Sequence, residues 1–431
     1  MRGRELELSG SDCFLRAMDR LARGKGASLC RLVVELDGAL DLETCREFLN
    51  ESAVLRWAAN VTVHRPLLLA LPRWRLNGTE QPVPVIPEAL RVASGGHFHF
   101  HPADGRQRPQ GPLSFSLVRH SDSRTSCILN WDHVLMDARG AETLVRSLAD
   151  GPAGDAGLEK MFHSSPQVVE RGAAQGGVGS RFAYARKSIS YIAGVSGLPI
   201  AGLGTGREAS SGRYRVITFS RAETDRIRRR CEGLGAGCYH SLVFLAAATR
   251  GIHAVRMRRG EKNAHYLVPV PLSLRKIGGT EPVFSNHVSF LFYRMEPGEL
   301  DDLPGLVTGL KKRLREQVAG EIPHSYAEMM RFLRRLPQPL YTRLVAGPTQ
   351  GRLASFFFSC PGECCPGVDR FLGLPVRDIT HLAPVSGVPG LSVVFMFHDG
   401  RLKTILSMRQ DLLSGEETTL FETLLRRDLL E

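Results

Sequence analysis

A histidine at the end of an apolar run is the residue of this chain best placed to do chemistry. Residues 126–131 are typical of a buried strand and are followed by His133, and Asp137 then precedes residues 138–148, whose amphipathic pattern predicts a helix. A loop between a strand and a helix holds an imidazole on a rigid edge while a ring nitrogen stays accessible. Because imidazole titrates near neutral pH, this placement predicts a general base. Asp137 is expected to fix the loop by an ion pair or by capping the helix.

The same spacing also has a purely structural interpretation, in which His133 is a polar residue at a strand end and Asp137 only a cap. The flanking residues favour catalysis. The segment from Asp132 to Ala138 resembles the HHxxxDG active-site motif of the chloramphenicol acetyltransferase-like superfamily. That superfamily includes nonribosomal peptide condensation domains, wax ester synthase/diacylglycerol acyltransferases and polyketide-associated acyltransferases. Asp132 replaces the first histidine and Ala138 the glycine, while the second, catalytic histidine is kept as His133.

Four further segments resemble the same superfamily, in the same order along the chain. They are residues 8–12, 34–41, 268–275 and 285–289. The last resembles the second signature of the superfamily, which contains an asparagine, here Asn286. The DFGWG motif of plant acyltransferases is absent, which argues against that branch.

The resemblance implies transfer of an acyl group from a thioester to a hydroxyl or an amine. His133 would take the proton of the acceptor and return it to the leaving thiolate. The donor would be an acyl-CoA or a phosphopantetheinyl thioester, used as a substrate, with no permanently bound cofactor. Arg275 resembles the residue that pairs with the motif aspartate across the two lobes. Asp132, Arg275, Asn286 and Ser289 are therefore expected to support the site, either structurally or by stabilising the oxyanion.

The length of the chain, 431 residues, suits two domains better than one. A region rich in glycine, residues 151–212, separates two halves. With the resemblance, this predicts an α/β fold of two similar lobes, each a mixed sheet flanked by helices, with an active-site tunnel between them. We expect an N-terminal lobe over residues 1–175 that contains the motif. Residues 176–431 are expected to form the crossover segment and the C-terminal lobe.

Local patterns predict the individual elements. Strands are expected at 28–36, 67–71, 113–118, 126–131, 214–219, 264–272 and 288–293, and as a hairpin of 391–397 and 402–408 around the turn Asp399-Gly400. Helices are expected at 41–55, 138–148, 182–192, 221–234, 241–258, within 303–333, and after the capping box that begins at Ser414.

Two other functions stay open at this stage. His97, His99 and His101 alternate along a predicted strand, so their imidazoles share one face. With Asp104 they could serve a metal-dependent hydrolase, although the same alternation is typical of an edge strand. Alternatively, Asp132 in place of histidine suits a binding or scaffold protein that kept the fold and lost the activity. Metal analysis tests the first of these alternatives, and a thioester-consumption assay tests the second.

The amino-acid composition limits the kinds of molecule that the protein is expected to bind. Lysine and arginine number 56 against 44 acidic residues, a formal net charge of +12. The basic residues form short clusters without any nucleic-acid-binding motif, so we expect no nucleic acid. This positive charge could attract the phosphates of the donor or an acidic carrier protein. A solvated basic surface with no specific partner explains it equally well. The acceptor is expected to be a small-molecule or lipid alcohol or amine.

Cysteine usage and hydropathy bear on the compartment. Nine cysteines, an odd number mostly in apolar contexts, suit a reducing environment. Cys360, Cys364 and Cys365 lack a matching second pair and are interpreted as loop cysteines without a metal. No apolar stretch is long enough for a membrane span, although contact with a membrane surface stays open. The charged residues 1–11 lack a signal core, so we expect a cytoplasmic protein.

Overall fold

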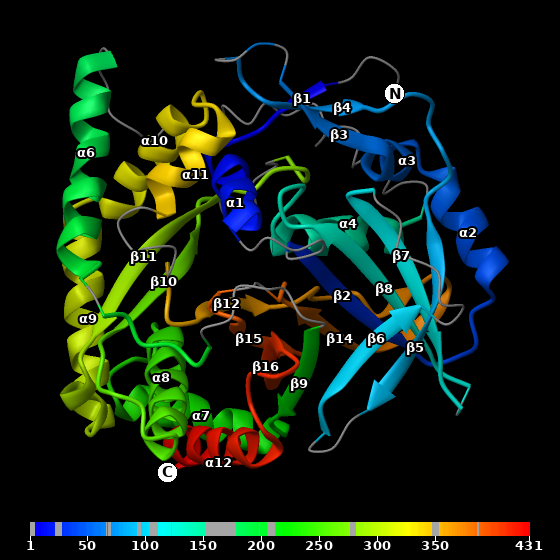
Figure 1. Ribbon diagram of the computed structural model, residues 1–431. Helices are drawn as coiled ribbons and strands as arrows, with labels where there is room; N and C mark the ends of the chain where they lie inside the picture. Colours follow the sequence, from blue (N-terminus) through cyan, green and yellow to red (C-terminus); the bar gives the residue numbers. More distant parts are fainter. Residues whose placement is uncertain are drawn as a thin grey trace.

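The computed structural model describes residues 5–21, 28–65, 67, 70–92, 96–102, 111–121, 123–151, 178–197, 199–204, 212–275, 282–346, 353–385 and 388–431. Its main feature is a sheet of eleven strands in the order β12-β15-β16-β9-β6-β5-β7-β8-β2-β14-β13 (Figure 1). These strands are β2 (Leu29–Leu36), β5 (Val85–Val92), β6 (Phe98–Pro102), β7 (Leu113–Arg119), β8 (Thr125–Asp132), β9 (Gly212–Thr218), β12 (Phe357–Glu363), β13 (Arg370–Phe371), β14 (Leu374–Leu382), β15 (Leu391–His398) and β16 (Arg401–Arg409). Parallel and antiparallel pairs both occur, so the sheet is mixed.

Two smaller sheets and the helices complete the structure. One sheet has the order β1 (Glu5–Glu7), β4 (Arg73–Leu76), β3 (Val61–His64), and the other pairs β10 (Tyr266–Ser273) with β11 (Val288–Met295). The helices are α1 (Gly10–Leu21), α2 (Leu42–Glu51), α3 (Ala53–Asn60), α4 (Ala138–Ala149), α6 (Val178–Val195), α7 (Arg221–Gly233), α8 (His240–Arg258), α9 (Leu303–Ala319), α10 (Ile322–Leu333), α11 (Gln338–Ala346) and α12 (Gly415–Leu430), with the 3-10 helix η3 (Pro297–Leu300). None of the helices in the described ranges is long and apolar enough to cross a membrane.

Two large hydrophobic cores hold these elements together. The first lies around β2, β7, β8 and α4 and also includes Ile379 and Leu382 of β14. The second lies around α8, α12, β15 and β16, and Figure 1 shows α7, α8 and α12 grouped at the end of the molecule where the chain terminates. The mixed α/β class expected from the sequence is confirmed. The expected boundary at residue 175 lies outside the described residues.

Most expected elements are found within a few residues, including the hairpin. Asp399 and Gly400 have φ of 49° and 70°, the conformation that a two-residue type I′ turn requires. The capping box at the start of α12 is formed by Ser414 and Glu417. The predicted helix 182–192 is longer than expected, as α6.

Three expectations were wrong in part. Residues 41–55 do not form one helix, because Ser52 ends α2 and caps α3 through the backbone N–H of Leu55. The region 303–333 is two helices, since Glu321 adopts a left-handed φ of 56° between them. The strand expected at 67–71 is not formed by Leu67, Ala70 or Leu71, and 66, 68 and 69 lie outside the described residues. Pro72 has no backbone N–H to donate to a neighbouring strand, and the strand begins only at Arg73, as β4.

Candidate active site

His133 lies directly after β8, in the turn that leads into α4. Its backbone N–H donates to the carbonyl of Ser28 at 2.9 Å, at the start of the neighbouring strand β2. The indole N–H of Trp131 donates to the carbonyl of Met136 at 3.0 Å and ties the turn to the strand that precedes it. The turn is therefore held at both ends by hydrogen bonds to buried elements, as a site on a rigid scaffold requires.

Asp137 caps α4 and pairs with Arg275 from the second half of the chain. Its carboxylate accepts from the N–H of Gly140 at 2.8 Å, from Arg275 Nε and Nη2 at 3.1 and 3.0 Å, and from the N–H of His287 at 3.0 Å. Burial alone would raise the pKa of Asp137, but Arg275 and His287 outweigh it and hold that pKa below its ordinary value. The bidentate ion pair implied by the resemblance and the helix cap are thus formed by the same side chain.

Asn286 lies beside the imidazole and determines which ring nitrogen bears the proton. Its Nδ2 donates to Asp12 Oδ1 and to the backbone carbonyl of His133, both at 2.8 Å. Both partners are pure acceptors, so the orientation of the amide is fixed. The amide Oδ1 then lies 3.1 Å from His133 Nδ1. Because a carbonyl oxygen only accepts, Nδ1 must donate, which leaves the lone pair on Nε2.

Asp12 completes this arrangement, although in the sequence it stands out only as the last residue of the segment 8–12. It is fully buried in α1 and accepts from the N–H of Ser9, from the hydroxyl of Ser285, and from both the backbone and the side chain of Asn286. Burial raises the pKa of Asp12, and the bonds from Asn286 and Ser9 partly offset this. The spacing Ser9-x-x-Asp12 is a capping-box signal that predicts a helix start. It gives no sign of a partner 274 residues away.

The remaining support residues have structural partners. Asp132 Oδ1 accepts from the N–H of Val134 at 2.8 Å, and the carboxylate also bonds with the Ser28 side chain. Burial raises the pKa of Asp132, and these bonds partly offset it. Ser289 is fully buried and donates its hydroxyl to the carbonyl of Pro323. The Ser289 hydroxyl is thus bonded to α10 and not to His133.

The histidines of the alternative metal hypothesis do not converge. His99 and His101 have ring centroids 5.9 Å apart in β6, and His97 is buried just before this strand. Among the described residues, these three do not form a group whose ligand atoms lie within 4.8 Å of one another. Asp104 lies outside the described residues. Within the described residues, the proposed hydrolase site is therefore not assembled.

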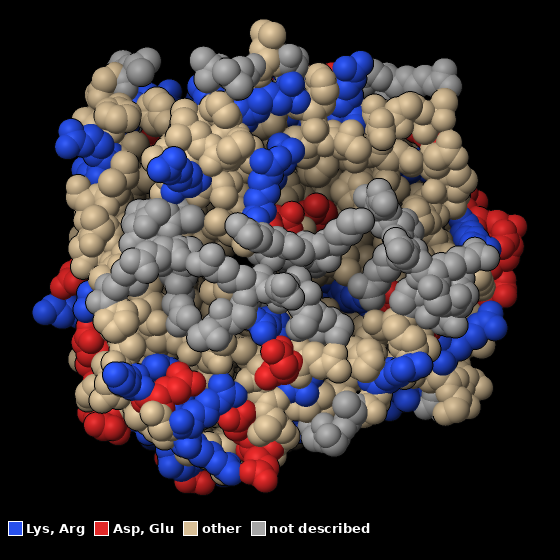
Figure 2. All heavy atoms as spheres, in the orientation of Figure 1, with Lys and Arg blue, Asp and Glu red and all other residues tan. Residues whose placement is uncertain are grey.

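Charge on the visible face is spread out. Figure 2 shows basic side chains scattered over this face and mixed with acidic ones over its lower part. The basic excess is thus not gathered into one continuous patch on this face, unlike the footprint of a nucleic-acid-binding surface.

Comparison with known proteins shows that the chain has a fold already seen in solved structures. No family model matches the chain, and no curated protein matches it. Among solved structures it is similar to the TRI3 trichothecene 15-O-acetyltransferase from Fusarium sporotrichioides, with a TM-score of 0.68 and 11% identity over 99% of this chain and 95% of that one. It is also similar to the first condensation domain of the calcium-dependent antibiotic synthetase (TM-score 0.63, 15% identity, 100% and 96% covered).

A third similar structure is polyketide synthase associated protein 5 from Mycobacterium tuberculosis, with a TM-score of 0.63 and 15% identity over 97% of each chain. These likenesses span nearly the whole of both chains at low identity. The chain therefore has the two-lobed fold of condensation domains and of the TRI3 acetyltransferase. This is the chloramphenicol acetyltransferase-like fold. The fold that the sequence resemblance implied is confirmed.

Proposed function

We propose that this protein is an acyltransferase that moves an acyl group from a thioester donor to a hydroxyl or amine acceptor, with His133 as the general base. The observation that supports it most is the fixed imidazole. Asn286 holds Nδ1 as a donor, so Nε2 has a free lone pair for a proton of the acceptor. The ion pair of Asp137 and Arg275 fixes the turn in which the base lies.

The reaction follows from this arrangement. His133 Nε2 takes the proton of the acceptor O–H or N–H as the acceptor atom attacks the thioester carbonyl carbon. The tetrahedral intermediate then collapses, the C–S bond breaks, and the imidazolium returns the proton to the leaving thiolate. General base help contributes about 10²- to 10⁴-fold, and positioning of the two substrates supplies most of the rest.

The name of one similar structure supports a hydroxyl as the acceptor. One is named an O-acetyltransferase, which acts on a hydroxyl, and others are condensation domains. For the donor we propose an acyl-CoA or a carrier-bound phosphopantetheinyl thioester, whose phosphates suit the net charge of +12. All nine cysteines are free, which supports a reducing compartment such as the cytoplasm.

The test is a search for turnover by the purified protein. A panel of acyl-CoA and acyl-pantetheine thioesters is incubated with alcohols and amines, free thiol is measured continuously, and acylated products are identified by mass spectrometry. We expect one thiol released for each ester or amide formed. Release of thiol that does not depend on any acceptor would indicate hydrolysis instead.

Asp132 does not by itself favour the inactive alternative. The Asp132 carboxylate bonds with the N–H of Val134 and with the Ser28 side chain, so it shapes the turn, while His133 Nδ1 bonds with Asn286 instead. A protein that binds thioesters or acceptors but consumes none across the panel would instead be the scaffold that the sequence left open.

A further inference from the structure

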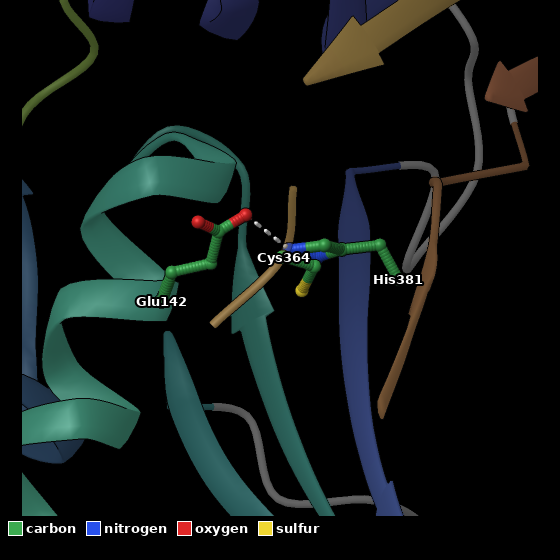
Figure 3. A group of neighbouring side chains, drawn as sticks. All are labelled: Glu142, Cys364 and His381. Atoms are coloured by element: carbon green, nitrogen blue, oxygen red, sulfur yellow. Dashed lines mark hydrogen bonds and ion pairs between the residues drawn. The ribbon is translucent and has the colours of Figure 1, made fainter. Parts of the chain in front are cut away.

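A second cluster of reactive side chains lies in the core and plays no part in the proposed acyl transfer. Glu142 comes from α4, Cys364 directly follows β12, and His381 lies in β14; Figure 3 shows the three side chains directed toward one another. Their exposed fractions are 2%, 0% and 5%. One ligand atom from each lies within 4.8 Å of the other two. The group therefore places a carboxylate, a sulfur and an imidazole nitrogen at one buried point.

The spacing of these atoms is close to that of a zinc site. Zinc holds His nitrogen and carboxylate oxygen at about 2.0–2.2 Å in tetrahedral geometry, which sets two such donors about 3.3 Å apart. His381 Nε2 and Glu142 Oε1 are 3.0 Å apart, so they need to separate by only a few tenths of an ångström. For sulfur at about 2.3 Å from zinc, the matching separation is about 3.6 Å. The three ligand atoms lie within 4.8 Å of one another, so the Cys364 sulfur has to approach the other two by about 1.2 Å or less.

Outer contacts already fix two of the three side chains. Arg139 pairs with Glu142 Oε2, the oxygen that does not face His381. The same guanidinium donates to the carbonyls of Pro361 and Glu363, on the segment that precedes Cys364. The Trp131 ring packs edge-on against His381, with centroids 6.2 Å apart. Such outer contacts orient metal ligands in known sites.

Zinc binding would require Cys364 to lose its thiol proton. Burial alone would raise the pKa of Glu142, but His381 and Arg139 outweigh it and lower that pKa, so the carboxylate is ionised at neutral pH. A hydrogen bond with Cys365, burial and the nearby Glu142 raise the pKa of the Cys364 thiol. A divalent cation bound here would replace this repulsion with attraction and release the thiol proton to the buffer. It would also displace the Nε2 proton that His381 donates to Glu142, and that proton would move to Nδ1 of the same ring.

We infer that Glu142, Cys364 and His381 form a buried zinc site, with water as the fourth ligand. Sulfur and imidazole select zinc over magnesium or calcium. The ion would join α4, the helix that begins beside His133, to the segment after β12 and to β14 of the main sheet. No sequence pattern indicates this group, because Glu142 and His381 are 239 residues apart. The inference does not depend on the proposed acyl transfer.

The test is metal binding by the full chain. The protein is stripped with a chelator and titrated with ZnCl₂ against a chromogenic zinc indicator, and a second portion is loaded with Co²⁺. We expect one zinc per chain, and a thiolate-to-cobalt charge-transfer absorption that shows a sulfur ligand. Cys364→Ser and His381→Ala should each weaken zinc binding by at least about 10²-fold. Cys238→Ser, at an exposed cysteine, and His64→Ala, at an exposed histidine, should leave it unchanged.

Each result is decisive. If the wild-type protein binds no zinc, or if its cobalt form lacks the thiolate absorption, the inference is wrong. Binding that survives in both Cys364→Ser and His381→Ala would place the ion at another site. Should these variants fail to fold, the near-isosteric Glu142→Gln variant decides instead, and an unchanged zinc affinity in that variant would contradict the inference. Acyl transfer by a zinc-free protein would contradict neither this inference nor the proposed function.

Discussion

At the scale of single residues, the contacts from Asp12 through Asn286 to His133 explain how the orientation and the tautomer of the base are fixed. Asp12 is buried and bonded to Asn286 twice, through the backbone N–H at 2.7 Å and through Nδ2 at 2.8 Å. If this contact were lost, the amide could turn and present Nδ2 to the imidazole, which would favour the wrong tautomer. Asp12 is thus a positioning residue that acts through Asn286.

This predicts a defect in turnover without a matching defect in binding. Asp12→Asn should lower kcat by about 10²-fold, the cost of a misplaced reacting group, and change KM little. In ¹H–¹⁵N spectra of the imidazoles, the His133 signal should shift away from the Nδ1–H tautomer. Asp41→Asn, at the exposed cap of α2, is the matched control and should keep both kcat and tautomer. An unchanged tautomer in Asp12→Asn would show that Asp12 is merely structural.

At the scale of elements, Asp137 serves α4 and the contact between the two halves of the chain at once. These roles can be separated, because serine caps a helix as well as aspartate but cannot pair with arginine. Breaking a buried ion pair on one side costs about 3–5 kcal/mol. Asp137→Ser should therefore lose most of the stability that Asp137→Ala loses, and the serine should recover about 1 kcal/mol from the cap.

A double-mutant cycle measures the pair itself. Asp137→Ala and Arg275→Ala should each lower the free energy of unfolding, and the double variant should lose clearly less than the sum, by about 1–3 kcal/mol. Denaturant titration of the four proteins gives the coupling. Arg275 also donates to the carbonyls of Pro282 and Ser285, at 3.0 and 3.1 Å. Additive losses would mean that the aspartate acts only as a cap and that these carbonyls hold Arg275.

The lowered pKa of Asp137 predicts that the stability of the protein depends on pH. The folded-state pKa of Asp137 lies below its ordinary value, which in unfolded chains is about 3.9. Its contribution is therefore fully present above the unfolded pKa and is lost as pH falls through the folded pKa. The difference in unfolding free energy between wild type and Asp137→Ser should be constant from about pH 7 to pH 5 and should shrink on further acidification. If the difference in unfolding free energy increased on acidification, the pKa of Asp137 would not be lowered in the folded protein.

At the scale of the whole molecule, the main sheet does not divide along the sequence. β14, from the second half, pairs with β2 from the first, and its Ile379 and Leu382 belong to the first core. Residues 1–151 alone would expose the edge of β2 and leave that core incomplete. We expect this fragment to show no cooperative unfolding transition by circular dichroism. Cooperative unfolding comparable to that of the full chain would show that the first half is an independent domain.

This topology also shows why the sequence predicted some features and missed others. The strand before His133, the helix after it and the hairpin at Asp399-Gly400 depend on local patterns, and they were predicted. Asn286 and Arg275 were placed at the site only through the resemblance. Asp12 and the Glu142–His381 contact depend on residues 274 and 239 positions apart, which no local pattern links. The break between α9 and α10 at Glu321 was not predicted, because a non-glycine residue with positive φ has no clear sequence signal.

The most direct test of the whole account is thioester consumption by His133→Ala beside wild type. The base accounts for about 10²- to 10⁴-fold of the rate, so kcat/KM should fall by that factor while the unfolding midpoint stays near the wild-type value. His64→Ala, which removes an exposed histidine in β3, is the matched control and should keep full activity. A His133→Ala variant that turns over thioester at nearly the wild-type rate would contradict the account.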